Sequence, residues 1–406
     1  MTDLVQQYGY YSEGESFTIA DPNEIWIMEM IGKGPGIRGA VWVAVRVPDD
    51  CISAHANQSR IHQFDMNDKE NCMYSPDVVS FAREKGYFNG VNKDFSFSLA
   101  YAPLDFGARR FCEARVWSYF NKFTDNGKEY LPYIEGKTDT PMPLFVKPKH
   151  KLSVQDVKDM MRDHYEGTPL DISNDFGAGP YKTPYRLSPL NFKVDDKEYF
   201  NERPISTQQS GFVFVAQMRA HKPDPIGGVL WFGVDDANMT VFTPVYCCAT
   251  KVPVCYTRVD GADYITFSWN SAFWIFNWVS NMVYPRYDLM IGDVREAQKE
   301  METTFNNAQE GIEEMAAKLL AKDKNAAVDF LTNYTNMTAQ STFDTWKRLG
   351  EFLVVKYNDG VVKRMKNGQF ERNSIGQPAG VIRPGYPKEF LEEYVKQTGD
   401  RYKMPE

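Results

Sequence analysis

The sequence predicts an α+β fold in which helices pack on antiparallel sheets. Strand-like segments occur in two separate blocks, and helical segments lie between the blocks and after the second one. The chain shows no regular alternation of single strands and helices, which is the pattern typical of a parallel sheet. With 406 residues, of which 43% are hydrophobic, the chain is long enough to bury a large core.

Four strand-like segments follow one another near the N-terminus, separated by turn residues and a glycine-rich loop. The turn Asp21-Pro22-Asn23-Glu24 joins the first two as a hairpin, so we expect all four to begin one antiparallel sheet. Ahead of them, Leu4, Val5 and Tyr8 have the spacing of a helix face, which predicts that the sequence opens within a helix. The four strand-like segments are residues 17–20, 25–30, 41–47 and 51–55.

Helices are predicted next, because residues that cap helices precede apolar residues with helical spacing. One helix begins after Ser75-Pro76-Asp77 and one covers residues 108–120. Another begins at Ser153, with Asp156 placed for a capping box. Strands return in a second block, at residues 212–219, 228–234 and 240–245.

The last third of the chain is predicted to be mainly helical. Residues 273–279 form a buried helix, and apolar residues from Met290 to Leu319 make one stripe along a long helix. A helix at residues 341–351 is expected to lead into a strand at residues 352–357, which Asn358-Asp359-Gly360 returns as a hairpin. A final helix is expected near residues 388–396. We expect one domain over residues 1–406, with sheet and helix layers at 1–270, a helical part at 271–352, and a hairpin and tail at 353–406.

Composition and missing motifs exclude several classes of function. Acidic and basic residues are interspersed at a net charge of −8, so no basic stripe is available for nucleic acid. The apolar run at residues 273–279 is too short to span a membrane. Five scattered histidines form no HExxH pair and no glycine loop has P-loop spacing, so we expect no metal and no cofactor. No export signal is recognisable, which leaves the compartment open.

Longer motifs are more specific than these exclusions. Together they resemble the dipeptidase A-like family of N-terminal-nucleophile cysteine peptidases (peptidase family C69/U34), and the likeness extends over more than half of the chain. The motifs are Gly14-Glu15-Ser16-Phe17, Val43-Ala44-Val45-Arg46-Val47-Pro48-Asp49-Asp50, Ala54-His55-Ala56-Asn57-Gln58-Ser59-Arg60-Ile61, Arg203-Pro204-Ile205-Ser206 and Gly227-Gly228-Val229-Leu230-Trp231.

The resemblance implies a four-layered αββα sandwich of antiparallel sheets, here with a long-helix extension toward the C-terminus. It also implies catalysis by a cysteine that is the first residue of the mature protein and whose α-amine acts as the base. Family members begin with a Cys-Thr segment that an Arg and an Asp follow, and none of these is found here. We therefore expect that the N-terminal catalytic segment is missing and that this chain alone is inactive. A terminal Thr2 is the alternative nucleophile, because an internal cysteine lacks the free α-amine.

Four residues are candidates for contact with a substrate. Asn57 is the catalytic candidate, because an asparagine after a strand helps to form the oxyanion hole in the wider cysteine branch of these hydrolases. The alternative is an asparagine that stabilises a turn. Arg203 is a candidate partner for a substrate carboxylate, with a structural ion pair as the alternative. Arg46 and Glu29 are candidate substrate contacts on strands, with a satisfied buried arginine and a solvated carboxylate as the alternatives.

The function that follows is a dipeptidase of broad specificity, which hydrolyses the one amide bond of a small peptide through a thioester intermediate. Two alternatives stay open. A non-catalytic protein that resembles the secernins would bind a ligand or partner on the same scaffold. A hydrolase of another amide, such as a penicillin or a bile-salt conjugate, would share only the superfamily. The expected partners are a small peptide and, as an open question, further copies of the chain.

Overall fold

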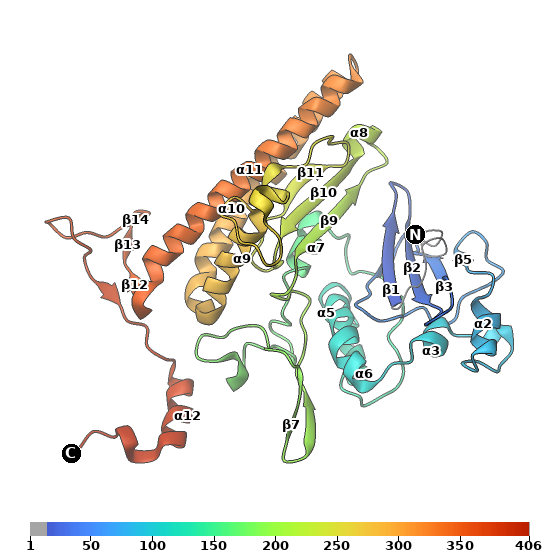
Figure 1. The fold of residues 1–406 in the computed structure, drawn as a ribbon, viewed down its shortest axis with the longest axis horizontal. Coiled ribbons are helices and arrows are strands. Elements are labelled where there is room, and N and C mark those ends of the chain that lie inside the picture. Colours follow the sequence, from blue (N-terminus) through green and yellow to red (C-terminus); the bar gives the residue numbers. More distant parts are fainter. Residues whose placement is uncertain (1–13, 406) are drawn as a thin grey trace. The chain divides into compact units, whose positions relative to one another are not determined.

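The computed structural model describes residues 14–405, and these residues form two compact units (Figure 1). Unit 1 contains residues 14–156, 188–204 and 218–220, and unit 2 contains the rest. Each unit is described by itself. The helix expected around Leu4 to Tyr8, and Thr2 as alternative nucleophile, lie outside the described residues.

Unit 1 is built on a four-stranded antiparallel sheet with the strand order β1-β2-β3-β5. The predicted first hairpin is confirmed, because β1 and β2 pair antiparallel around the turn at residues 21–24. The Asp21 side chain fixes that turn by accepting hydrogen bonds from the backbone N–H groups of Asn23 (2.7 Å) and Glu24 (2.9 Å). The strands are β1 (Gly14–Ala20), β2 (Ile25–Gly32), β3 (Ala40–Arg46) and β5 (Cys72–Tyr74).

Both faces of this sheet are apolar, since successive side chains of a strand point to opposite faces. On one face, Ile27 and Val43 belong to a large buried cluster that includes Phe81 and Phe97 from helices. The other face carries a smaller cluster, whose members are Phe17, Trp26, Met28, Met30, Ala40, Trp42 and Ala44. Glu29 lies on the first of these faces, directly across from Val43, and is therefore a carboxylate in an otherwise apolar row.

The fourth predicted strand is not part of the sheet. Residues 51–55 contain only the short strand β4 (Ile52–Ser53), which pairs with β6 (Phe145–Val146) instead of β3. The reason is that β5 already occupies the free edge of β3, pairing with residues 43–45. The expectation that residues 51–55 extend this sheet was therefore wrong.

The helices predicted between the two strand blocks are confirmed, and the last of them, which begins after Ser153, crosses from unit 1 into unit 2. The segment at residues 108–120 is one continuous helical stretch with a π-helical turn, η2, in the middle. The capping box is present, because the backbone N–H of Ser153 donates to Asp156 (2.8 Å) and that of Asp156 donates to the Ser153 hydroxyl (3.1 Å). The elements are α2 (Val78–Glu84), α3 (Phe97–Tyr101), α4 (Phe106–Ala108), η2 (Arg109–Glu113), α5 (Ala114–Phe123), α6 (Leu131–Ile134) and α7 (Val154–Met160), with a hairpin of β7 (Asn191–Val194) and β8 (Lys197–Phe200).

Unit 2 contains a three-stranded sheet with the order β11-β10-β9, which confirms the second predicted strand block. Its last strand begins at Thr243 instead of residue 240, because residues 235–242 are irregular and fully buried. The carbonyl groups of Asn238 and Thr240 accept hydrogen bonds from the Gln298 amide (2.9 and 2.6 Å), which replaces the missing sheet pairing. The strands are β9 (Phe212–Met218), β10 (Gly228–Val234) and β11 (Thr243–Tyr246).

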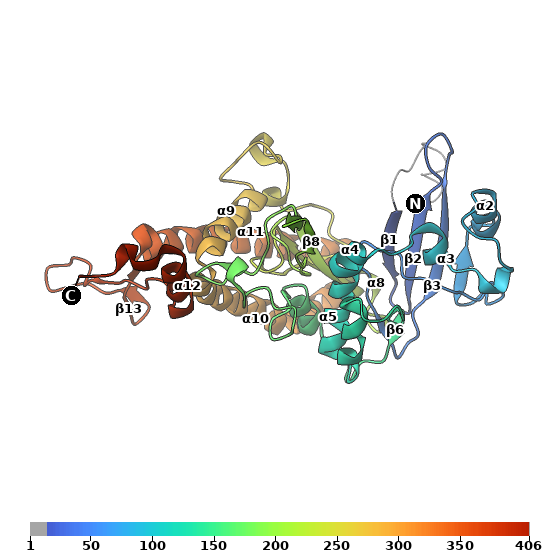
Figure 2. The ribbon, with the colours of Figure 1, turned by 90° about the horizontal axis from the view of Figure 1, so that it is seen from below.

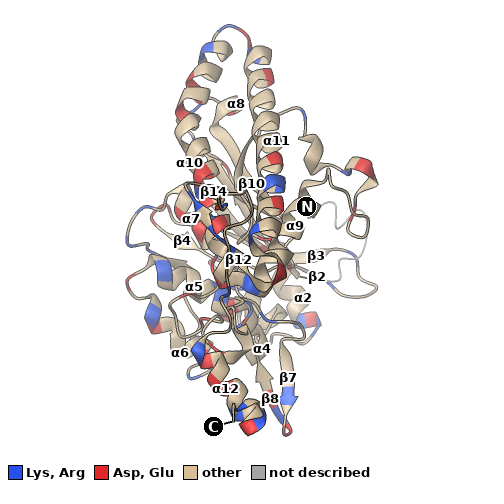
Figure 3. Ribbon diagram, turned by 90° about the vertical axis from the view of Figure 1, so that its left-hand side faces the viewer, with Lys and Arg blue, Asp and Glu red and all other residues tan. Residues whose placement is uncertain are grey.

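Three helices make up most of the rest of unit 2: α9 (Ala272–Val283), α10 (Tyr287–Leu320) and α11 (Lys324–Tyr357). The long helices α10 and α11 lie side by side (Figures 1 and 2). The predicted apolar stripe of α10 is buried at Met290, Val294, Met301 and Phe305, but Met315 near its end is 46% exposed. Acidic and basic residues are interspersed along both helices (Figure 3).

The predicted strand at residues 352–357 and its hairpin were wrong, because this segment is the last part of α11. Leu349, Leu353 and Tyr357 are buried at four-residue spacing, so they form one face of a helix. After it, β12 (Val362–Lys363) pairs with the distant β15 (Val381–Ile382). The last predicted helix is confirmed as α12 (Lys388–Thr398).

The mixture of helices and small antiparallel sheets confirms the α+β class. The αββα sandwich stays a prediction. No helix in residues 14–405 has both the length and the apolar content that crossing a bilayer requires. Within the same residues, no cluster of His, Cys, Asp and Glu side chains has the arrangement of a metal site.

Candidate active site

The loop that carries Asn57 is held on one side by the π-turn and helix α5. Asn57 is exposed and has a left-handed backbone with φ 54°, a conformation that asparagine tolerates better than most residues. The Arg115 guanidinium donates to the Asn57 side-chain oxygen (3.0 Å) and to the backbone carbonyl of Ala56 (3.4 Å). The Cys112 thiol donates to the backbone carbonyl of Asn57 (3.7 Å). Two residues of one helical stretch therefore hold the loop at Asn57.

Glu29 holds the other end of the same loop. Its carboxylate accepts hydrogen bonds from the Ser59 hydroxyl (2.5 Å) and from the backbone N–H groups of Arg60 (2.6 Å) and Ile61 (3.1 Å). The residue is 1% exposed, and this burial raises its pKa, while the three donors and the Arg60 charge act in the opposite direction. The alternative interpretation of Glu29 as a solvated carboxylate was wrong, since β2 places it inside the unit.

Arg60 makes a third attachment. Its guanidinium forms an ion pair with Glu113 of the π-turn (Nε to Oε1, 2.9 Å), and both side chains are almost fully buried. It also donates to the backbone carbonyls of Ala54 (2.8 Å) and Pro143 (3.0 Å). A buried arginine needs this many partners, because each N–H group left without an acceptor would cost free energy. The loop at residues 54–61 is thus fixed at its start, at Asn57 and at its end.

Arg203 belongs to unit 1, and its charge acts on the Cys112 thiol. Burial raises the pKa of the Cys112 thiol, and the positive charges of Arg115 and Arg203 oppose that rise. The charge of Arg203 thus acts on the same thiol that donates to the backbone carbonyl of Asn57. This electrostatic effect is the link between these two residues, which were both predicted from sequence.

Arg46 is placed differently. Its guanidinium pairs with Glu24 (2.8 Å) and with Asp49 (2.5 Å), and the side chain is 23% exposed. These two carboxylates raise the pKa of Arg46. They hold the start of β2 and the turn after β3 together. Arg46 is thus an arginine whose charge is paired within the fold, as in the alternative interpretation. Its side chain is half-buried instead of fully buried.

Sequence reasoning missed Arg115 and Glu113, two residues that organise this site. Both come from a helical stretch more than fifty positions after Asn57, and a helix-surface arginine has no motif of its own. Arg60 and Ser59 lay within a recognised motif, Ala54 to Ile61, but nothing in the motif indicated which of them faces inward. Only the folded chain shows that they contact Glu29 and Glu113.

The six cysteine thiols share one electrostatic feature. Burial raises the pKa of every one of these thiols, so each is held in its protonated, weakly nucleophilic form. An activated cysteine would instead have a lowered pKa, produced by a nearby positive charge or base. The six residues are Cys51, Cys72, Cys112, Cys247, Cys248 and Cys255.

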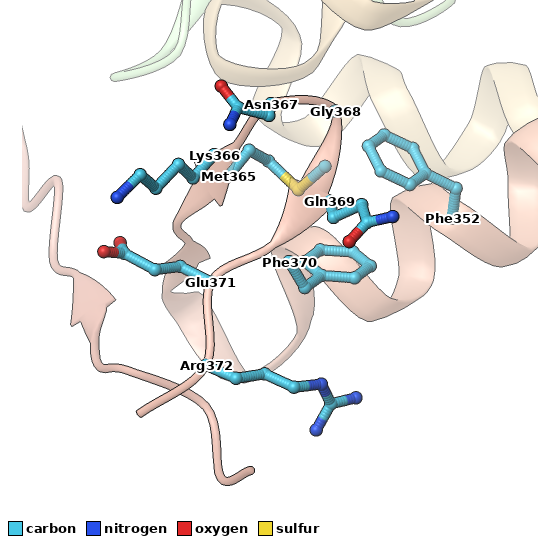
Figure 4. A pocket seen from close by; sticks show the side chains of 9 residues that line it. All are labelled: Phe352, Met365, Lys366, Asn367, Gly368, Gln369, Phe370, Glu371 and Arg372. Carbon is cyan, nitrogen blue, oxygen red and sulfur yellow. The ribbon is translucent and has the colours of Figure 1, made fainter. Parts of the chain in front are cut away.

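A hollow of about 800 Å³ lies elsewhere, between the end of α11 and a short hairpin of β13 (Met365–Lys366) and β14 (Gln369–Phe370). Figure 4 shows the Phe352 and Phe370 rings in it, while Lys366 and Glu371 extend away. The lining comes from Phe352 and residues 365–372, so it contains no motif residue, cysteine or histidine. We therefore place the candidate active site at the loop around Asn57 and not in this hollow.

Comparison with known proteins identifies the family of this chain. The family model of peptidase family C69 matches residues 1–300, which include the Asn57 loop and both strand blocks. The chain belongs to peptidase family C69. Among its relatives, a "Probable dipeptidase" of Salmonella dublin is 31% identical over 246 residues, which is 60% of this chain and 49% of that protein.

Two further relatives carry similar names. A "Probable dipeptidase" of Latilactobacillus sakei is 27% identical over 288 residues, covering 71% of this chain and 53% of that protein. "Dipeptidase A" of Lactobacillus helveticus is 24% identical over 272 residues, covering 67% and 50%. The chain therefore spans about half the length of the curated relatives it matches.

Proposed function

We propose that this C69 chain forms the scaffold of a dipeptidase, which hydrolyses the single amide bond of a dipeptide by cysteine chemistry. In this proposal, the Asn57 amide stabilises the oxyanion that develops on the scissile carbonyl, and Arg203 binds the substrate carboxylate. We do not assign substrate contacts to Glu29 or Arg46, because the loop at residues 54–61 and two neighbouring carboxylates occupy them.

The observation that supports the proposal best is the set of contacts that holds Asn57 in place. A donor contributes to catalysis only if it is already aimed before charge develops, because reorienting it would cost free energy at that moment. Arg115 and Cys112 hold the side chain and backbone of Asn57 respectively, and Glu29 fixes the end of the loop. An asparagine that merely stabilised a turn would not need its side-chain oxygen engaged by a guanidinium.

The proposed nucleophile is a thiol at a chain terminus, with its own α-amine as the base, and it is none of the six cysteines of this chain. The thiol adds to the scissile carbonyl, its proton passes through the amine to the leaving amino group, and the C–N bond breaks to leave a thioester. Water then adds to the thioester and releases the acid and the free thiol. The raised thiol pKa values support this exclusion of the internal cysteines.

The test measures binding and turnover separately. Isothermal titration of the purified chain with alanyl-alanine is expected to show binding, and blocking the peptide carboxylate as an amide should weaken it by about tenfold or more, since a charge-assisted hydrogen bond contributes about 1.5–3 kcal/mol. Arg203→Ala should remove this preference for the free carboxylate. Arg46→Ala is the matched control, because it removes another half-buried arginine of unit 1 that pairs within the fold.

Turnover by this chain should stay at the level of the uncatalysed reaction. Rapid hydrolysis that disappears in Cys112→Ala would contradict the proposed nucleophile, and a chain that binds neither form of the dipeptide would contradict the function.

A second candidate function, ligand binding without turnover, is favoured by the six protonated thiols. It predicts that the chain binds dipeptides and does not hydrolyse them.

A further inference from the structure

We propose that Arg115 is the positioning residue for Asn57, because its guanidinium holds the side-chain oxygen and so turns the amide N–H₂ group away from the helix. The catalytic use of that amide rests on the proposed function. The orientation itself rests only on contacts within unit 1.

The identity of the contacting atom follows from chemistry. An asparagine side chain has an acceptor oxygen on one arm and two N–H donors on the other, and exchanging the arms leaves the shape almost unchanged. A guanidinium has donors only, so the arm that lies 3.0 Å from Arg115 must be the oxygen. The N–H₂ arm then points the opposite way. This orientation is the one that an oxyanion-stabilising asparagine requires.

Arg115 is itself held in place for this contact. Its Nε–H donates to the backbone carbonyl of Phe111 (2.7 Å), one turn earlier in the same helical stretch. The same Nη2 that contacts the Asn57 side chain also lies 3.4 Å from the backbone carbonyl of Ala56. The Arg115 guanidinium therefore contacts both the side chain of Asn57 and the backbone of the preceding residue. Its own position is fixed by its hydrogen bond within the helical stretch.

Three substitutions of Arg115 distinguish orientation of the Asn57 amide from simple support of the loop. Arg115→Lys keeps a donor-only group, so it should keep the orientation. Arg115→Gln offers both a donor and an acceptor, so it allows either arm of Asn57 to face the helix. Arg115→Met offers neither. Arg109→Met is the matched control, because Arg109 lies in the same helical stretch, in the π-turn before α5, but donates to Thr138 and Asp139.

The first measurement is the amide spectrum of the chain labelled with ¹⁵N-asparagine, in which the Asn57 side-chain signals are those lost in Asn57→Asp. We expect them at unchanged positions in the Lys variant and in the Arg109→Met control, and displaced or broadened in the Gln and Met variants. Unchanged signals in the Gln and Met variants would overturn the proposal. This measurement needs neither substrate nor turnover.

The second measurement is the affinity for alanyl-alanine. If the Asn57 amide rotates freely, only a fraction of the molecules have its N–H₂ group turned toward the substrate, and the apparent affinity falls in proportion to that fraction. The Gln and Met variants should therefore bind the dipeptide about two- to tenfold more weakly. The Lys variant should bind within twofold of the wild type. If the wild type binds no dipeptide, the proposed function fails, while the amide spectrum still decides the orientation. If the wild type binds and all variants match it, the positioning role is wrong.

Discussion

Arg60 and Glu113 form an ion pair in which the two side chains are only 3% and 4% exposed, with Nε and Oε1 2.9 Å apart. The pair joins the Asn57 loop to the π-turn that precedes α5. Because two charges have been taken out of water, each depends on the other for compensation. The arginine also donates three hydrogen bonds to backbone carbonyls, those of Ala54, Met142 and Pro143.

Removal of one partner should be costly. Glu113→Ala leaves a buried guanidinium without its counter-charge, and we expect the free energy of unfolding to fall by about 3–5 kcal/mol in urea titrations. The double variant Arg60→Met/Glu113→Leu should lose less than the single one. Glu24→Ala is the control, since its pair with Arg46 is partly exposed and should contribute less than about 1 kcal/mol. Equal losses for Glu113→Ala and Glu24→Ala would contradict this view of the pair.

Asn57→Asp should separate binding from stability. The new carboxylate keeps an acceptor toward Arg115 and can pair with its charge, so we expect a thermal midpoint equal to or above that of the wild type. The same change removes both side-chain N–H donors and places a negative charge beside a substrate carbonyl. Dipeptide affinity should therefore drop at least tenfold in isothermal titration. A variant that binds dipeptides normally would exclude the Asn57 amide as a contact.

Asp235 of unit 2 should make stability depend on pH. It is 1% exposed, and burial together with neighbouring Asp236 raises its pKa to about 7, although Asn277 and Ser280 donate to it (2.9 and 2.8 Å). The folded state therefore binds more protons than the unfolded state between about pH 4 and pH 7, so this contribution to stability is present at low pH and is lost as pH rises through that window.

Asp235→Asn removes this titration and retains a residue that tolerates the left-handed backbone found there, φ 64°. Relative to the variant, the wild type should lose a few kcal/mol of unfolding free energy between pH 4 and pH 8, measured by urea titrations at several pH values. A difference between the two proteins that stays constant across this range would show that Asp235 has no raised pKa.

Gly350 in α11 should not accept a side chain. A Cβ atom there would lie 2.2 Å from a ring carbon of Trp278 in α9, so the ring or one of the two helices would have to move. Gly350→Ala should destabilise the protein by about 1–3 kcal/mol even though alanine favours helix formation. Gly311→Ala in α10 meets no atom within 4 Å and should stabilise by up to about 1 kcal/mol. Calorimetric midpoints that move in the same direction would contradict this contrast.

Much of the fold could be predicted from local patterns. The hairpin of β1 and β2, the capping box of α7 and the long stripe of α10 each depend on residues close together in sequence. Residues 352–357 were misread because a run of valines and aromatics favours a strand in isolation. Burial of Leu349, Leu353 and Tyr357 in α11 overrides that preference, and only the tertiary structure shows it.

The candidate site was predictable in part, for a similar reason. Asn57 and Arg203 lay in recognised motifs; the Cys112 thiol donates to the Asn57 backbone, and the charge of Arg203 acts on that thiol. Arg115 is 58 positions from Asn57, and a contact over that separation leaves no local signature. Glu29 was misjudged for a different reason, because a single carboxylate in an apolar strand suggested that its side chain is exposed. The loop at residues 59–61 supplies hydrogen-bond donors that make burial of this carboxylate tolerable.

The π-helical turn at Arg109–Glu113 sets the rotational phase of everything that follows it. Removing one residue from the turn would restore ordinary helical winding and swing α5 by about 100°, the angle that one residue occupies in an α-helix. Arg115 would then face away from the bend at residues 56–57, although every amino acid of the site was still present. This short stretch should therefore tolerate exchanges of residue type more readily than any change in its length.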